Sequence, residues 1–271
     1  MTPRFSGPGV LAALLCLVLM TACGSDGDDE PGGRTSAAAV PSASDLPTSV
    51  TDKCGIESTA EVSNIEASDG SVLTAATVGS GDQVMILLHQ TSPSGYCGWV
   101  PYADWAAEQG VRAVLVDLCG WGSAVCSDDL TADPEAQVRL MVDWAREQGA
   151  TRVAVVGASM GGAIALGVAD EAGADAVVDL SGPETWQNVP GAEEAAAGTE
   201  IPLLVVTAPG DTGVDHDLLQ RAVEASPASP KRFISAPDGH GWSMLHDGSS
   251  VAPEWRPLAT TVLDWARGET G

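Results

Sequence analysis

Short apolar runs alternate with amphipathic stretches through most of the chain. The run at residues 84–88 is apolar at every position and too short for a helix, which is typical of a strand buried on both faces. Similar β-branched runs recur further along, at residues 111–118, 152–157, 176–180, 201–207 and 232–235. Because amphipathic stretches separate these runs, the pattern predicts an α/β fold, with a mostly parallel twisted sheet covered by helices on both faces.

Two of the amphipathic stretches have clear helix signals. Asp133 can cap a helix that has Pro134 in its first turn and an apolar stripe at positions 138, 141, 142 and 145. A second stripe, formed by Trp255, Leu258, Val262 and Ala266, predicts a helix near the end of the chain. Both helices would pack an apolar face on the sheet.

Residues 61–83 precede the first buried run and have a different pattern. They are more polar and contain a turn signal at Ser68-Asp69-Gly70, which predicts a hairpin. A hairpin ahead of βα units gives the sheet an antiparallel N-terminal edge. Between the runs that end at residue 180 and begin at residue 201, about twenty residues remain. A separate lid domain needs about 50 or more, so we expect no large cap domain.

The first 23 residues have the pattern of an export segment. An apolar run at residues 10–20 follows Arg4; it matches a signal h-region of about 7–15 residues and is shorter than the ~20 residues of a membrane span. Leu19-Met20-Thr21-Ala22-Cys23 resembles the lipobox of bacterial lipoproteins, which implies lipidation at Cys23. The alternative is an ordinary signal peptide with a cysteine near its cleavage site.

The rest of the chain divides into a tether and one domain. Residues 24–52 are rich in Gly, Ser, Asp, Ala and Pro and have no apolar periodicity, so we expect a disordered tether. Residues 53–271 are long enough for a single large domain. A lipid at Cys23 followed by a tether predicts an extracytoplasmic protein, anchored to the outer face of the bacterial cytoplasmic membrane.

The charge of the chain limits its partners. The formal net charge of -25 repels nucleic acid and anionic lipid headgroups, so we expect neither as a partner and expect membrane contact only through the lipid. Solubility is the simpler meaning of this charge. We expect a monomer.

Cysteine usage agrees with export. Two of the six cysteines fall in residues 1–23, and an even number in an oxidising compartment predicts two disulfides. Three pairings are possible. The short loop between Cys119 and Cys126 favours that pair, which leaves Cys54 with Cys97. No C-x-x-C pair or neighbouring histidine indicates a metal site, so we expect no metal.

Residues 157–161 carry the main chemical signal. Gly157-Ala158-Ser159-Met160-Gly161 matches G-x-S-x-G and lies between a predicted strand and a predicted helix, as in a nucleophile elbow. A phosphate-binding turn is the alternative, but no G-x-G-x-x-G or lysine follows. Ser159 is therefore the candidate nucleophile.

A serine needs a base, and the chain has four histidines. His89 comes too early for the Ser…Asp…His order, while His216 and His246 have the surroundings of solvated surface residues. His240 follows the last predicted strand, in Asp238-Gly239-His240-Gly241, and is the candidate base.

A carboxylate must orient the imidazole of that base. Asp211 follows the run at residues 201–207 and is the candidate, although its Pro-Gly-Asp context also suits a simple turn. Asp215 and Glu184 are the alternatives. For the oxyanion hole, the backbone N–H of Met160 is one donor, and Gln90 or Thr91 supplies the second.

Three blocks together resemble the α/β-hydrolase superfamily over residues 61–267. They are the strand and loop at residues 84–90, the turn Asp117-Leu118-Cys119-Gly120-Trp121-Gly122-Ser123, and the elbow at residues 157–162. The chain is similar to uncapped esterases and dienelactone hydrolases of this superfamily. One departure is Gln90, where the superfamily usually has glycine; a side chain there narrows the oxyanion loop or offers an amide to the substrate.

The resemblance implies a serine hydrolase of carboxylesterase type, without a cofactor, that cleaves an ester-type acyl bond through an acyl-enzyme. We expect a small-molecule or polymer-borne acyl substrate in an open cleft, with Trp121, Trp186 and Trp242 as possible lining residues. A peptidase, a thioesterase and a non-catalytic binding protein on the same fold are the alternatives.

Overall fold

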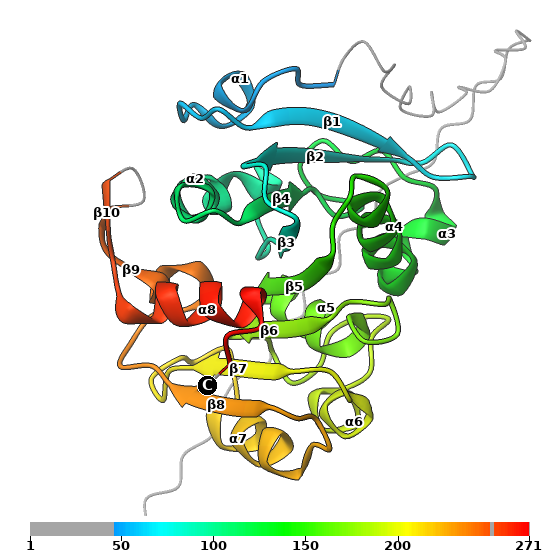
Figure 1. The fold of residues 1–271 in the computed structure, drawn as a ribbon. Helices are drawn as coiled ribbons and strands as arrows, with labels where there is room; N and C mark the ends of the chain where they lie inside the picture. Colours follow the sequence, from blue (N-terminus) through cyan, green and yellow to red (C-terminus); the bar gives the residue numbers. More distant parts are fainter. Residues whose placement is uncertain (1–45, 250–251, 271) are drawn as a thin grey trace, which may run out of the picture. The chain divides into compact units, whose positions relative to one another are not determined.

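An eight-stranded mixed sheet is the centre of the fold (Figure 1). The computed structural model describes residues 46–249 and 252–270. The predicted signal segment with Cys23 and most of the predicted tether lie outside the described residues. In chain order the strands are β1 Glu61–Glu66, β2 Val72–Val78, β3 Gln83–Leu88, β4 Arg112–Val116, β5 Arg152–Ala158, β6 Ala176–Leu180, β7 Leu203–Thr207 and β8 Lys231–Ser235.

The strand order is β1-β2-β4-β3-β5-β6-β7-β8. The hairpin of β1 and β2 pairs antiparallel, and β2 pairs antiparallel with β4; all other neighbours are parallel. The predicted α/β architecture with an antiparallel N-terminal edge is therefore confirmed. Because β3 to β7 are buried at nearly every position, their sequences are mostly apolar without alternation, and the acidic residue Asp179 of β6 is an exception.

Helices cover both faces of the sheet (Figure 1). One face packs against α2 (Val100–Glu108) and α8 (Pro257–Arg267). The other face packs against α4 Pro134–Glu147, α5 Met160–Val168, α6 Ala192–Gly198 and α7 His216–Ala225. The predicted cap of α4 is present, because Asp133 accepts a hydrogen bond from the backbone of Ala136 at 2.9 Å.

The segment between β6 and β7 is short, as the sequence predicted. Its one α-helix is α6, of seven residues, so the fold has no large cap domain over the C-terminal ends of the strands. No helix among residues 46–249 and 252–270 is long and apolar enough to cross a membrane.

The C-terminal part differs from the predicted pattern. A small hairpin, β9 (His246–Ser249) with β10 (Ala252–Trp255), precedes α8 and was not predicted. Trp255 lies in β10 and not in the helix. The centroid of its ring lies 5.3 Å from that of Trp105 in α2. The apolar stripe of α8 begins at Leu258.

The folded part also begins earlier than residue 53. Ser49 caps a short helix, α1 (Val50–Cys54), by accepting a hydrogen bond from the backbone of Asp52 at 3.0 Å. Leu46 and Val50 are buried. The described structure thus begins several residues before the predicted end of the tether, and two apolar residues are too few to form a periodic pattern in the sequence.

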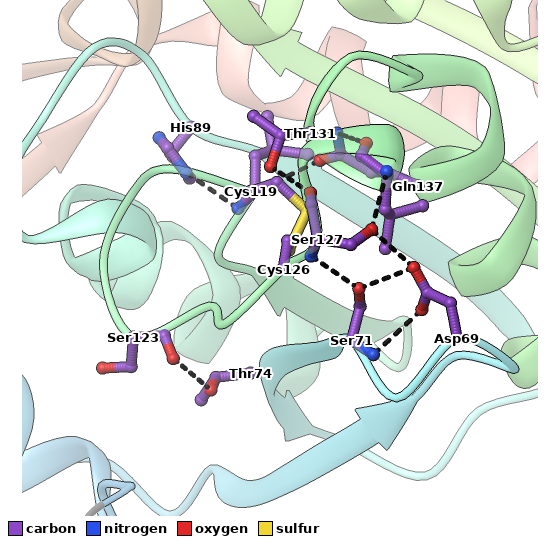
Figure 2. The surroundings of a disulfide bond; sticks show 12 residues. Asp69, Ser71, Thr74, His89, Cys119, Ser123, Cys126, Ser127, Thr131 and Gln137 are labelled. Atoms are coloured by element: carbon purple, nitrogen blue, oxygen red, sulfur yellow. Dashed lines mark hydrogen bonds between the residues drawn. A yellow bond between two sulfur atoms is a disulfide. The ribbon is translucent and has the colours of Figure 1, made fainter. Parts of the chain in front are cut away.

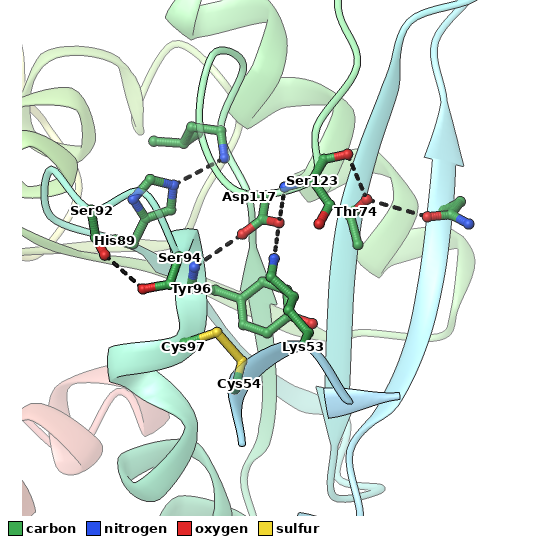
Figure 3. Close-up of polar contacts among 12 residues, drawn as sticks. Lys53, Cys54, Thr74, His89, Ser92, Ser94, Tyr96, Cys97, Asp117 and Ser123 are labelled. Carbon is green, nitrogen blue, oxygen red and sulfur yellow. Dashed lines mark hydrogen bonds and ion pairs between the residues drawn. A yellow bond between two sulfur atoms is a disulfide. The ribbon is translucent and has the colours of Figure 1, made fainter. Parts of the chain in front are cut away.

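A disulfide and a buried ion pair connect α1 to the loops that follow β3 and β4 (Figure 3). Cys54 bonds Cys97 in η2, a 3₁₀ helix over Gly95–Trp99. Lys53, which precedes Cys54, forms an ion pair with Asp117, whose side chain is fully buried. Asp117 also accepts hydrogen bonds from the backbone of Tyr96 at 3.0 Å and of Ser123 at 2.7 Å. One carboxylate therefore organises both loops, and it explains the aspartate of the 117–123 turn.

A second disulfide, Cys119–Cys126, closes the loop after β4 (Figure 2). The backbone of Cys119 donates to the amide of Gln137 in α4 at 2.9 Å, and Ser127 donates to Asp69 of the β1–β2 turn at 2.6 Å. The loop is therefore tied to a helix and to the hairpin. Both cysteine pairs that the sequence favoured are present in the structure.

Candidate active site

Ser159 lies on a strained turn between β5 and α5. Its φ of 51° and ψ of -119° are a backbone conformation that non-glycine residues rarely adopt. A Cβ atom on Gly157 would overlap the carbonyl of Gly161, and one on Gly161 would overlap the carbonyl of Leu88. The glycines therefore let three backbone segments meet, and the serine projects from the meeting point. This geometry is that of the nucleophile elbow that the sequence predicted.

His240 and Asp211 meet beside this turn. The Nδ1 atom of His240 lies 2.7 Å from a carboxylate oxygen of Asp211. The strands before them, β7 and β8, are neighbours in register, with Thr207 opposite Ser235, so their following loops come together. The Asp211 side chain is 5% exposed and that of His240 is 40% exposed. With Nδ1–H donating to the buried carboxylate, Nε2 of His240 is left as an acceptor.

The loop of His240 packs directly on the elbow. A Cβ atom on Gly241 would lie 3.2 Å from the Cβ of Ala158 and 3.7 Å from the backbone nitrogen of Ser159. The structure therefore brings the three sequence-predicted residues Ser159, His240 and Asp211 to the same edge of the sheet. Among the described residues, no hydrogen bond joins Ser159 to His240; such contacts are often long in proteins without substrate.

The structure places the alternative residues elsewhere. Asp215 caps α7 by accepting a hydrogen bond from the backbone of Leu218 at 2.9 Å, and Glu184 makes no side-chain hydrogen bond to a described histidine. His216 contacts Ser235 and Asp217 at the start of α7, and His246 lies in β9. Within the described part of the chain, neither makes a hydrogen bond to Asp211 or Ser159.

His89 has a structural environment. Its Nδ1–H donates to the carbonyl of Gln90 at 2.7 Å, and its Nε2 accepts from the backbone of Leu118 at 3.2 Å. Burial lowers the pKa of His89, which agrees with these neutral-form contacts. His89 thus joins the loops after β3 and β4, and the sequence had no signal for this bridge because its partners are backbone atoms.

The candidate oxyanion donors lie at two places. Met160 is the first residue of α5, so its backbone N–H is outside the hydrogen-bond ladder of the helix. Thr91 is exposed, whereas Gln90 is half-buried in the loop after β3. The Oε1 atom of Gln90 is buried without a partner among the described residues and lies against Gly241. The Gln90 side chain therefore fills space between the oxyanion loop and the histidine loop.

A cavity of about 190 Å³ opens beside Met160. Trp121, Cys119 and Leu118 of the loop after β4 form one wall, and Trp186 of the segment after β6 forms another. Trp242 is not part of this cavity; its ring packs on Gly98 and lies 5.7 Å from Trp99. A larger hollow of about 800 Å³ lies elsewhere, against Glu57, Asp104 and Glu108, and contains none of the candidate residues.

Within the described residues, no three His, Cys, Asp or Glu side chains come together as a metal site requires. The chemistry that the site can perform with its own groups is proton transfer at His240 and nucleophilic attack by Ser159.

The strand order and the strained turn between β5 and α5 are those of the α/β-hydrolase fold. Solved structures of this class match the chain with low identity. They include DcsB in complex with its substrate analogue (TM-score 0.62, 15% identity, 78% of this chain and 99% of that chain). Dienelactone hydrolase from Anabaena variabilis gives a TM-score of 0.55 at 16% identity, covering 78% of this chain and 97% of that chain.

The family model of the dienelactone hydrolase family matches residues 107–242, half of the chain, and the chain belongs to this family. Curated relatives include 2-hydroxy-6-oxononadienedioate/2-hydroxy-6-oxononatrienedioate hydrolases. The one from Burkholderia vietnamiensis is 34% identical over 97 residues, covering 34% of this chain and 32% of the relative. The one from Escherichia coli is 29% identical over 87 residues, covering 31% of this chain and 30% of the relative. The chain therefore matches only about a third of the length of these relatives.

Replacing Gly241 by alanine should destabilise the protein, because its backbone is left-handed and Gln90 and Ala158 crowd the place of an added Cβ. The φ of Gly241 is 56°, and an added Cβ would lie 2.7 Å from Oε1 of Gln90. We expect Gly241→Ala to lower the free energy of unfolding by about 2–4 kcal/mol, measured by urea denaturation.

Gly213→Ala is the matched control, because a Cβ there meets only Asp211 Oδ1, at 3.8 Å. Its effect should stay within about 0.5 kcal/mol. Equal stabilities of the two variants would contradict the packing of the histidine loop on the elbow.

Proposed function

We propose that the protein is a serine hydrolase that cleaves carboxylic esters, with Ser159 as nucleophile, His240 as general base and Asp211 as the residue that orients the histidine. The observation that carries the proposal is the 2.7 Å contact between His240 Nδ1 and Asp211, in a loop that packs on the backbone of Ser159. Membership of the dienelactone hydrolase family supports it. The relatives named above are themselves hydrolases.

The reaction follows from the positions of these groups. Oγ of Ser159 attacks the ester carbonyl while its proton passes to Nε2 of His240, and the buried carboxylate of Asp211 stabilises the resulting imidazolium. Negative charge on the carbonyl oxygen is held by the N–H of Met160 and by a second backbone N–H, from Gln90 or Thr91. The tetrahedral intermediate collapses, and the alcohol leaves with the proton from His240. Water then releases the acid from Ser159 by the same steps in the second half of the reaction.

The cavity beside Met160 supports a preference for compact acyl groups. A cavity of about 150 Å³ accommodates a benzene ring, so about 190 Å³ is enough for a ring-sized group. The flat faces of Trp121 and Trp186 favour planar or short aliphatic acyl groups over long chains. The Cys119–Cys126 disulfide fixes the loop that carries Trp121. This fixed wall limits the size of the cavity.

We also propose that the protein is exported and held at the outer face of the bacterial cytoplasmic membrane by a lipid on Cys23, and that it acts as a monomer on small-molecule or polymer-borne esters. The sequence of residues 19–23 supports the anchor. The two disulfides agree with an oxidising compartment.

Replacing Ser159 by alanine should abolish ester hydrolysis. Because the nucleophile and its base act as one unit, we expect kcat for p-nitrophenyl acetate to fall by about 10⁴- to 10⁶-fold, with unchanged thermal stability. Ser235→Ala is a matched control: Ser235 also contacts a histidine, His216, at 3.0 Å, but the next backbone N–H, of Ala236, is bonded to Thr207. Ser235→Ala should retain full activity. Activity that survives in Ser159→Ala would refute the proposal.

The size of the acyl group should decide the rate. Across p-nitrophenyl acetate, butyrate, benzoate and decanoate, we expect kcat/KM to be highest among the first three. Trp186→Ala, which enlarges the cavity, should raise the relative rate on decanoate. The exposed neighbour Thr185 provides the control Thr185→Ala, which should leave the order unchanged. If wild type prefers decanoate, the cavity does not hold the acyl group.

Cys23→Ser should release the protein from the membrane. In a GC-rich bacterial host that lipidates lipoproteins, wild type should sediment with membranes, and the variant should be found in the soluble exported fraction. Cys16→Ser, upstream in the same export segment, should stay with the membranes. If the wild type were found in the soluble fraction, the proposed lipid anchor would be wrong, but the proposed hydrolase activity would be unaffected.

A further inference from the structure

A buried carboxyl group lies beneath the candidate site and takes no part in the mechanism above. Asp179 belongs to β6, between β5, which leads to Ser159, and β7, which leads to Asp211. The other four residues of β6 are apolar, and Asp179 is 0% exposed. Burying a carboxyl group at such a position has an unfavourable free energy, so its presence needs an explanation.

Asp179 has too few hydrogen-bond donors around it to stabilise its ionised form. One oxygen, Oδ1, accepts the backbone N–H of Gly182 at 2.6 Å. The other, Oδ2, is buried without a hydrogen-bond partner among the described residues. Burial raises the pKa of Asp179 from its ordinary 3.8 to about 7, and only the Gly182 hydrogen bond opposes this. The neutral carboxyl group is therefore the form that this site accommodates.

No nearby charge changes this balance. Asp179 stands opposite Gly157 in β5 and Val205 in β7. Strand β7 and helix α5 contain no charged residue, and the one in β5, Arg152, is at the far end of that strand. Its carboxyl oxygens lie against Gly162 and Gly182, and no charged side chain contributes to the shift of its pKa. A negative charge on Asp179 would thus have no cation beside it.

The position of Asp179 links it to Ser159 from two sides. Gly182 follows the end of β6 at Leu180 by two residues, and the carbonyl of Leu180 accepts the backbone N–H of Ser159 at 2.8 Å. On the other side, Oδ1 of Asp179 fills the place where a Cβ of Gly162 would be, in the first turn of α5. The carboxyl group is therefore packed between the turn that holds the serine backbone and the helix that follows the serine.

We propose that Asp179 is a positioning residue that keeps the Ser159 turn in its active conformation while its carboxyl group is neutral, and that ionisation of this group switches the enzyme off. The proposal rests on the proposed function of Ser159. Ionisation would demand hydrogen-bond donors that the site lacks, so Gly162 and Gly182 must move or admit water. The new charge would also lie by the first turn of α5, where it opposes the charge that develops on the carbonyl oxygen of the substrate.

The activity test is a pH profile of kcat on p-nitrophenyl acetate for wild type and Asp179→Asn. Asparagine has the same shape and can accept the Gly182 hydrogen bond, but it cannot ionise. We expect wild-type kcat to fall about tenfold for each pH unit above an apparent pKa near 7. Asp179→Asn should keep its plateau to pH 9.

The matched control is Asp133→Asn, which removes the same charge from the cap of α4 while keeping an acceptor for Ala136. It should show the wild-type profile. If Asp179→Asn keeps the wild-type alkaline loss, or loses activity at every pH, the proposal is wrong.

A second measurement is independent of activity. Because the pKa of Asp179 is higher in the folded protein than in the unfolded chain, the folded protein keeps a proton that the unfolded chain releases between about pH 4 and 7. The contribution of Asp179 to the free energy of unfolding of the wild type therefore falls as pH rises through this window, and it does not recover at higher pH. The Tm of Asp179→Asn relative to wild type should rise from pH 4 to pH 8, whereas that of Asp133→Asn should not.

A constant Tm difference between Asp179→Asn and wild type would overturn the proposal, as would a failure of Asp179→Asn to fold at pH 7, since a neutral isostere should be accepted there. If Ser159→Ala retained activity, the proposed function would fail, while the Tm comparison would still report whether Asp179 is neutral in the fold.

Discussion

The site depends on one strained backbone position. Ser159 can hold a φ of 51° because Gly157 and Gly161 allow β5, α5 and the end of β3 to approach without side chains between them. The sheet stabilises the fold against that strain, because it is buried on both faces and β5 pairs with β3 and β6 along its length. Ser159 follows β5 at the C-terminal edge of the sheet, from which the loops of Asp211 and His240 also extend.

Buried side chains fix the loops after β3 and β4, which lie around the serine turn. The carboxylate of Asp117 holds the backbone of Tyr96 and Ser123, and it is balanced by Lys53, which the Cys54–Cys97 disulfide keeps in place. His89 then joins the loops after β3 and β4 through backbone atoms. The proposed oxyanion donor from Gln90 or Thr91 thus lies on a loop that these contacts fix, so it need not be rearranged during a reaction. A short segment between β6 and β7 leaves this region without a large lid, and two tryptophans limit the space beside it.

Most of the fold was predictable because its signals are local. A strand buried on both faces must be apolar throughout, and the elbow needs glycines at fixed spacing, so both can be recognised from sequence. Asp211 was preferred from its place after a strand, and the structure puts it against His240. The donor that completes the oxyanion hole was not decided, because backbone N–H groups have no residue signature. Helix α1 and the β9–β10 hairpin were missed because they depend on tertiary packing. Asp179 was missed because one carboxyl group in an apolar run gives no pattern, and only its burial beside Gly162 and Gly182 reveals it.

In the proposed reaction, Ser159 is the residue that becomes acylated. The most direct measurement is to react the folded protein with a fluorophosphonate probe and to identify the modified peptide by mass spectrometry. We expect one probe molecule per chain, on Ser159, and none after denaturation. A probe on Ser235, or no labelling of a protein that hydrolyses esters, would contradict it.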